Sequence, residues 1–278
     1  MPRQAQEGNL ARVKPSGRFK SIINAAEGGT EIIPILYGYL EGGKLPDPFT
    51  VKVRGGTGDR PPDGWFHPST HPLMTERQLY YYLTDPGGWE PEPFGYTIKM
   101  SALVGSMVHD VVETALMDLG YLIKPKGVCV SCGLKQPSQC KEHGAIDEAT
   151  GTRGHMDGRL KDEGFEFKTA MPRILNNIAN NDIEAFRIKW PYYYAQVQEY
   201  MRMTGLLSYK VVVWAMGNPW DMREFTIKAD PFFQAEVQAK YLNVRRAVEL
   251  GEVPMVCCNP GSPTSRTCPA RRCPVKAM

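Results

Sequence analysis

The chain has 278 residues, of which 42% are hydrophobic and 23% are charged, so it can bury a full core and is expected to hold one catalytic domain with additions. No apolar run approaches the roughly eighteen residues of a membrane-spanning helix and the first residues are polar and basic, so we expect a soluble protein in the cytoplasm of a bacterial or phage-infected cell. A net charge of +3 does not by itself indicate nucleic-acid binding, although both ends are locally basic, as segments that lie along phosphates and solubilising tails both are.

Residues 1–100 are rich in glycine and proline and predict a loop-rich N-terminal region. Within it, residues 49–53 have the pattern of a short strand and residues 75–83 the pattern of a helix. Four aromatic side chains in this helix and just after it could stack on the bases of a single nucleic-acid strand. Burial against the core is the favoured interpretation of these aromatics, which are Tyr80, Tyr81, Tyr82 and Trp89.

Residues 101–250 predict the core of an α/β protein, with a mixed central sheet flanked by helices. A helix is expected over 101–119, where His109 and Glu113 lie one turn apart. A neutral imidazole at position 109 could complete the ligand set of a metal, and the alternative is a satisfied histidine at a helix surface. The apolar residues that recur at helical spacing here are Val104, Met107, Val108, Val111, Val112, Ala115 and Leu116.

A second helix is expected to begin at Pro191, because proline suits the first turn of a helix. Gln196 and Tyr200 fall one turn apart on it and could reach a nucleic-acid backbone or steady a neighbouring lysine. Residues 209–215 form an apolar run typical of a central strand, reached by a crossover connection. The remaining predicted elements are a strand at 223–228 and a helix that Asp230 caps, ending at Leu250 before Gly251.

The strongest signal is a predicted hairpin between the helix over 101–119 and the helix that begins at Pro191. The polar residues 161–164 indicate a four-residue turn, and the flanking residues alternate as strands do. Phe165 and Phe167 are then expected to face the core, since alternate side chains point to opposite sides. The predicted register pairs Leu160 with Phe165, Arg159 with Glu166 and Asp157 with Lys168.

Asp157, Glu166 and Lys168 would therefore share one face of the hairpin. Magnesium and manganese prefer carboxylate oxygens and keep several waters, so two acids on adjacent strands could hold such an ion beside a phosphodiester. A lysine next to a metal-bound water would favour hydroxide and the charge that grows in the transition state. The alternative interpretation is a solvated acidic face.

The seven cysteines form two groups, and clustered cysteines in a reducing compartment indicate metal binding. An insertion at residues 124–150 offers a possible zinc site from Cys129, Cys132, Cys140 and His143. A basic tail at residues 251–278 offers a possible zinc or iron–sulfur site, or unused thiols, at Cys257, Cys258, Cys268 and Cys273.

The order of four segments, 105–109, 154–157, 166–168 and 196–200, resembles the RecB-like branch of the PD-(D/E)xK nuclease superfamily, which includes CRISPR-associated and phage-encoded exonucleases. The resemblance covers residues 101 to about 216 and implies a restriction-endonuclease-like core. It implies that the metal is bound by His109, Asp157 and Glu166, that Lys168 assists the attacking water, and that DNA is held by Gln196 and Tyr200.

Several nucleases of this branch carry an iron–sulfur cluster held by one cysteine before the nuclease motifs and three after them. This chain departs from that pattern, because no cysteine precedes His109. A fourth ligand would have to come from Cys257 or from the insertion.

The resulting hypothesis is a DNA exonuclease that depends on Mg²⁺ or Mn²⁺ and acts on single strands or DNA ends, in recombination, repair or phage DNA metabolism, with recombination or replication proteins as possible partners. A non-catalytic nucleic-acid-binding protein stabilised by metal is the alternative from a different class. A structure-specific endonuclease is the alternative that keeps the chemistry.

Overall fold

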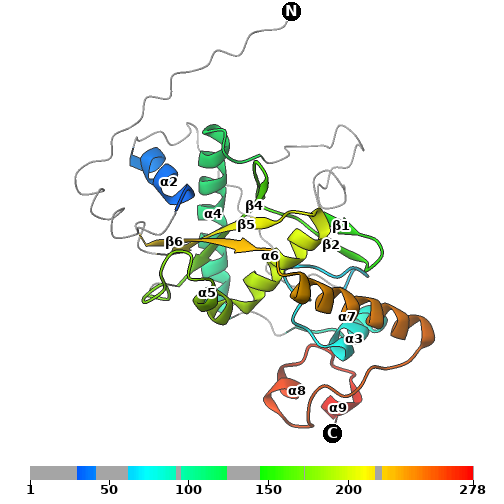
Figure 1. Ribbon diagram of the computed structural model, residues 1–278. Helices are drawn as coiled ribbons and strands as arrows, with labels where there is room; N and C mark the ends of the chain where they lie inside the picture. The colour runs from blue at the N-terminus through cyan, green and yellow to red at the C-terminus, as the bar shows by residue number, and fades with distance from the viewer. Residues whose placement is uncertain are drawn as a thin grey trace, which may run out of the picture.

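The computed structural model describes residues 30–41, 62–91, 95–123, 145–171, 173–216 and 221–277. A four-stranded mixed sheet lies at the centre, with helices on both faces (Figure 1). The inner pair β4·β5 is parallel, and both outer pairs are antiparallel. The mixed α/β architecture predicted from the sequence is therefore present. In sheet order the strands are β3 (Gly158–Leu160), β4 (Glu163–Ala170), β5 (Ser208–Ala215) and β6 (Met222–Lys228).

Strand β5 is buried on both faces, as its apolar run predicts. Because side chains alternate, Val211 and Val213 join the hydrophobic cluster under one pair of helices, while Val212 joins the cluster under another pair. The first pair is α5 (Ile183–Lys189) and α6 (Pro191–Thr204), and the second is α2 (Ile32–Glu41) and α4 (Tyr96–Asp118).

The parallel connection from β4 to β5 runs through α5 and α6. Helix α6 begins at Pro191, as predicted, because a proline in the first helical turn forfeits no intrahelical hydrogen bond. It ends at Gly205, whose φ of 73° is left-handed. The helix that follows β6, α7 (Pro231–Leu250), is capped by Asp230 and ends at Gly251, also as predicted.

The β3–β4 hairpin has a shorter turn than the sequence predicts. Lys161 and Asp162 form the turn, so Leu160 pairs with Glu163 and Gly158 with Phe165. The predicted pairs Leu160 with Phe165, Arg159 with Glu166 and Asp157 with Lys168 are therefore wrong. The reason is Gly164, which looks like a turn residue but lies within β4, where any Cβ would overlap the Tyr209 ring of β5.

Side chains along β4 alternate between the two faces of the sheet as predicted, although the register differs. Phe165 and Phe167 are buried in the cluster under α2 and α4, as predicted. Glu166 and Lys168 point to the other side and form an ion pair.

Helix α4 begins five residues earlier than predicted, and only part of its apolar face is buried. Val112, Ala115 and Leu116 pack in the core. Val104 and Met107 are 43% and 39% exposed. The helical spacing of apolar residues therefore predicted a longer buried face than the described residues form.

Helix α2 was not predicted. Its N-terminus is satisfied by the buried carboxylate of Glu224 in β6, which accepts hydrogen bonds from the backbone N–H groups of Glu31, Ile32 and Ile33 at 2.8–3.2 Å. The ammonium of buried Lys210 lies 3.6 Å from the same carboxylate. A helix anchored by a side chain almost two hundred residues away has no local sequence signal.

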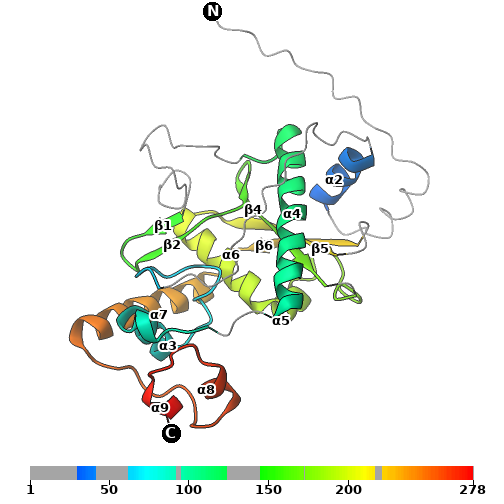
Figure 2. The same cartoon turned by 180° about the vertical axis from the view of Figure 1, so that it is seen from behind.

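The predicted N-terminal helix is α3 (Glu76–Thr84), which begins with a capping box formed by Thr75 and Gln78. Tyr80 and Tyr82 are buried, which confirms the core interpretation for these two rings. At the same end of the molecule lie α7 and the C-terminal tail, as Figures 1 and 2 show. The other short elements are η1 (Pro86–Gly88), β1 (Ala145–Asp147), β2 (Thr152–Gly154), α8 (Pro263–Thr267) and α9 (Pro274–Ala277).

The strand-like run at 49–53 lies outside the described residues. Within the described part of the chain, none of the helices combines the length and apolar character required to cross a bilayer.

We predict that Glu224→Ala lowers the free energy of unfolding by roughly 3 kcal/mol, because it leaves three N–H groups at the start of α2 without their buried acceptor and removes the buried carboxylate beside Lys210. Urea denaturation followed by circular dichroism measures the change. Glu249→Ala on the exposed side of α7 is the matched control and should shift the midpoint little. Equal midpoints for the two variants would show that the carboxylate does not anchor α2.

Candidate functional site

The site forms where α4 crosses β4. Gly105 makes this close approach possible, since a Cβ built there would lie 2.5 Å from Oγ1 of Thr169 in β4. One turn later, α4 presents His109, and Glu113 follows one further turn along the same face. The helix thus carries an imidazole and a carboxylate to the sheet.

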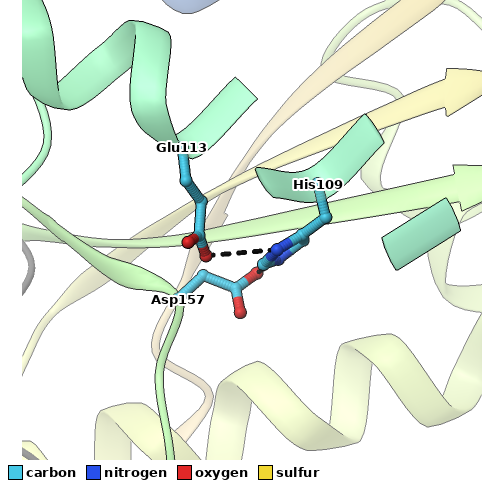
Figure 3. A group of neighbouring side chains, drawn as sticks. All are labelled: His109, Glu113 and Asp157. Carbon is cyan, nitrogen blue, oxygen red and sulfur yellow. Dashed lines mark ion pairs between the residues drawn. The ribbon is translucent and has the colours of Figure 1, made fainter. Parts of the chain in front are cut away.

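Asp157 meets these side chains from the segment that leads into β3. Its Oδ2 atom lies 2.8 Å from Nε2 of His109 and accepts a hydrogen bond of 2.8 Å from the backbone N–H of Phe167. Nδ1 of His109 lies 3.2 Å from Oε1 of Glu113 (Figure 3). One potential ligand atom from each of these three side chains lies within 4.8 Å of the other two, a spacing suited to one cation.

Glu113 is therefore a candidate ligand that the sequence alone did not assign. The only signal for it was its position four residues after His109, which also describes an ordinary helix surface pair.

Glu166 lies in β4, and its side chain is buried. Its Oε1 atom forms a 2.6 Å ion pair with Nζ of Lys168 and accepts a 2.9 Å hydrogen bond from Nε2 of Gln196. Its Oε2 atom is buried and has no hydrogen-bond partner in the described structure. A buried carboxylate oxygen without a donor is costly, and a bound cation would satisfy it.

The pKa values of Glu166 and Asp157 shift in opposite directions. Burial and the charge of Asp157 raise the pKa of Glu166 to about 7, although Lys168 acts in the opposite direction. Burial also acts to raise the pKa of Asp157, but the hydrogen bond and charge of His109 outweigh it and lower that pKa. The pKa of His109 is raised, because Asp157 and Glu113 outweigh the effect of burial. The site therefore favours positive charge between its carboxylates.

Gln196 and Tyr200 face inward from α6 and are 5% and 3% exposed. The Gln196 amide donates to Glu166, and the Tyr200 hydroxyl donates to the carbonyl of His155 at 2.6 Å. Gly154 leaves room for the tyrosine, since a Cβ there would lie 2.8 Å from its ring. In this arrangement both side chains contact protein groups of the site.

A cavity of about 420 Å³ opens beside His109, Asp157 and Lys168. Its walls come from α4, the segment that precedes β3, the end of β4 and the first turn of α6. This volume is within the range of small-ligand sites. The side chains that line it include His109, His155, Asp157, Lys168 and Tyr193.

A second group of side chains gathers in the C-terminal tail, beside α3. Cys257, Cys258, Cys268 and Cys273 are free and line one small cavity together with residues of α3. From α3, Nε of Arg77 donates to Sγ of Cys273 at 3.5 Å, and Nε2 of Gln78 donates to Sγ of Cys268 at 3.9 Å.

The basic residues of this tail are partly used within the protein. Arg272 forms an ion pair with Asp85, and Arg271 forms one with Glu90. These two charges hold the tail against η1 and its flanks. The predicted zinc ligands of the insertion, Cys129, Cys132, Cys140 and His143, lie outside the described residues.

No protein-family model matches the sequence, and no curated protein matches it. Among solved structures, an alkaline exonuclease from Laribacter hongkongensis, LHK-Exo, has a TM-score of 0.42 at 16% identity, over 68% of this chain and 89% of that chain. Its complex with dAMP has a TM-score of 0.40 at 15% identity over the same shares. The protein SSO0001 has a TM-score of 0.39 at 12% identity, over 90% of this chain and 99% of that chain. Likenesses this distant say nothing of activity.

We predict that Gly105→Ala destabilises the protein by roughly 1–3 kcal/mol, because its methyl group would press on Thr169 and force α4 away from β4. Gly38→Ala in α2 is the matched control: its Cβ meets nothing within 4 Å, so helix propensity should make it neutral or stabilising. Thermal unfolding measures both.

Thr169→Ala should rescue Gly105→Ala, since the remaining Cβ lies at an ordinary 3.7 Å. If Gly105→Ala is as stable as Gly38→Ala, the close approach of α4 is not a constraint.

Proposed function

We propose that this protein is a deoxyribonuclease that depends on a divalent metal, with a PD-(D/E)xK core in residues 101–250. One observation carries the proposal: His109, Asp157 and Lys168, from three separate segments, line one cavity, and Lys168 pairs with the buried carboxylate of Glu166, which keeps one oxygen without a donor. Such a set fits Mg²⁺ or Mn²⁺, which prefer carboxylate oxygen ligands. Glu113 adds a further carboxylate to the proposed ligands.

When bound, the ion would polarise the phosphodiester and favour ionisation of a water. The residues around it have separate tasks. His109, Asp157 and Glu166 would hold it. Lys168 would place its positive charge beside the phosphate oxygens, where negative charge grows as water attacks phosphorus and the bond to the leaving oxygen breaks. Gln196 would orient Glu166, and Tyr200 would fix the segment before Asp157 through the His155 carbonyl. Both would therefore act on substrate indirectly.

The proposed substrate is DNA, cleaved from ends or single strands in recombination, repair or phage DNA metabolism. A cavity that holds small ligands suits one nucleotide at a time more than an intact duplex. The proposed setting is the bacterial or phage-infected cytoplasm, where recombination or replication proteins would be partners.

We further propose that the tail cysteines hold a metal centre, either zinc or a [4Fe–4S] cluster. Support comes from four free thiols around one small cavity and from N–H donors directed at two of the sulfurs, as the hydrogen bonds around metal–thiolate centres are. The four ligands would all follow the catalytic residues, which departs from the one-plus-three pattern that the resemblance implies. Zinc at the insertion cysteines is proposed on their spacing alone.

Asp157→Asn and Lys168→Ala should each lower the rate of manganese-dependent degradation of an end-labelled single-stranded oligonucleotide by about a hundredfold or more, because the first removes a charged ligand of the proposed ion and the second removes the positive charge beside the phosphate. Matched controls are Asp162→Asn and Lys161→Ala in the exposed turn of the same hairpin, which should retain wild-type rates.

Degradation that survives both site variants would contradict the proposal. DNA binding that persists in EDTA without hydrolysis in any metal would instead favour the non-catalytic alternative. Cleavage of circular single-stranded DNA would indicate an endonuclease.

For the tail, we predict that Cys268→Ser with Cys273→Ser releases the bound metal of protein purified without oxygen, because two of four thiolates are lost. Elemental analysis for zinc and iron, with absorbance at about 400 nm, separates zinc from a cluster. Cys129→Ser with Cys132→Ser reports separately on the insertion. Wild-type protein that contains neither metal would rule out both centres.

A further inference from the structure

One face of α6 is aligned with the functional groups of the site. Tyr193, Gln196 and Tyr200 are three and then four residues apart, so they lie on the same side of the helix. Gln196 contacts Glu166, and Tyr200 contacts the carbonyl of His155. The first member of the row, Tyr193, places its ring 4.9 Å from Nζ of Lys168. Each of the three side chains thus supports a different group of the site.

We propose that Tyr193 is a positioning residue that holds the ammonium of Lys168 in the cavity through a cation–π contact; this inference rests on the proposed nuclease function. The ring lies within the roughly 6 Å range of such contacts and lines the same cavity as the ammonium.

Lys168 needs such a partner because the Glu166 carboxylate that it contacts also serves other groups. The carboxylate of Glu166 that lies 2.6 Å from Nζ also accepts from Gln196 and belongs to the proposed metal ligands. An aromatic face attracts an ammonium without neutralising it and without competing for a cation. It also restricts a long, flexible side chain whose free rotation would cost entropy when the charge must meet a phosphate.

The location of Tyr193 adds to this inference. It stands in the first turn of α6, directly after the start fixed by Pro191, so the ring is carried by a rigid element. Tyr192 beside it is 56% exposed and is not among the residues that line the cavity. The two neighbouring tyrosines therefore offer an internal comparison.

The test compares Tyr193→Leu, Tyr193→Phe and Tyr192→Leu. For manganese-dependent digestion of an end-labelled oligonucleotide, Tyr193→Leu should lower kcat about tenfold and change KM less than twofold, because the ring acts on the lysine. Tyr193→Phe keeps the aromatic face and should stay within about twofold of the wild type. Tyr192→Leu should match the wild type.

A second measurement needs no metal and no activity. Urea midpoints of the EDTA-treated wild type, Tyr193→Leu, Lys168→Met and the double variant form a double-mutant cycle. The two single shifts should not add, since either substitution removes the same contact.

Additive shifts, an unchanged kcat in Tyr193→Leu, or a rise in KM alone would overturn the inference, and the last result would mean that the ring binds substrate instead. Equal losses in Tyr193→Phe and Tyr193→Leu would also overturn it, because the hydroxyl would then be the active group. If wild type and Asp157→Asn are both inactive, the proposed function fails, while the urea cycle still decides whether Tyr193 holds Lys168.

Discussion

The carboxylate of Asp157 is the constraint on which the site depends. A single oxygen of this side chain contacts the imidazole of His109 in α4 and the backbone N–H of Phe167 in β4, so it ties a helix, a strand and the segment between β2 and β3 to one point. Hydrogen bonds to a charged acceptor are among the stronger ones, and here they are partly buried. The same contacts fix which oxygens and nitrogens face the cavity, so the scaffold and the proposed chemistry share one set of atoms.

Three glycines allow close packing in this part of the protein, because a Cβ at each position would overlap a neighbouring side chain. Gly105 lets α4 reach β4, Gly154 admits the Tyr200 ring, and Gly164 admits the Tyr209 ring. The stacked rings of Tyr200 and Tyr209 then lie between α6 and the sheet. Since α6 also supplies Gln196 to Glu166, packing on this face of the sheet directly sets the position of a proposed metal ligand.

The C-terminal tail is attached to the N-terminal part of the described chain. Arg77 and Gln78 of α3 reach the cysteine cavity, and Arg272 reaches Asp85. Trp89 and Ala270 form a backbone bridge in the same region. A tail with two short helices and a small apolar cluster has little core of its own, so these contacts and the proposed metal centre would together hold it.

The sequence by itself determined the elements whose signals are local. The alternation of β4, the apolar run of β5, the start of α6 at Pro191 and the end of α7 at Gly251 follow from periodicity and backbone preferences within a few residues. It also placed acids, a histidine and a lysine on elements that could converge. Tertiary structure decided what depends on distant partners: the hairpin register, set by Gly164 against Tyr209, and helix α2, anchored by Glu224. It also decided which side chains Glu113 and Tyr193 contact, because a residue's neighbours across an interface leave no trace in its local pattern.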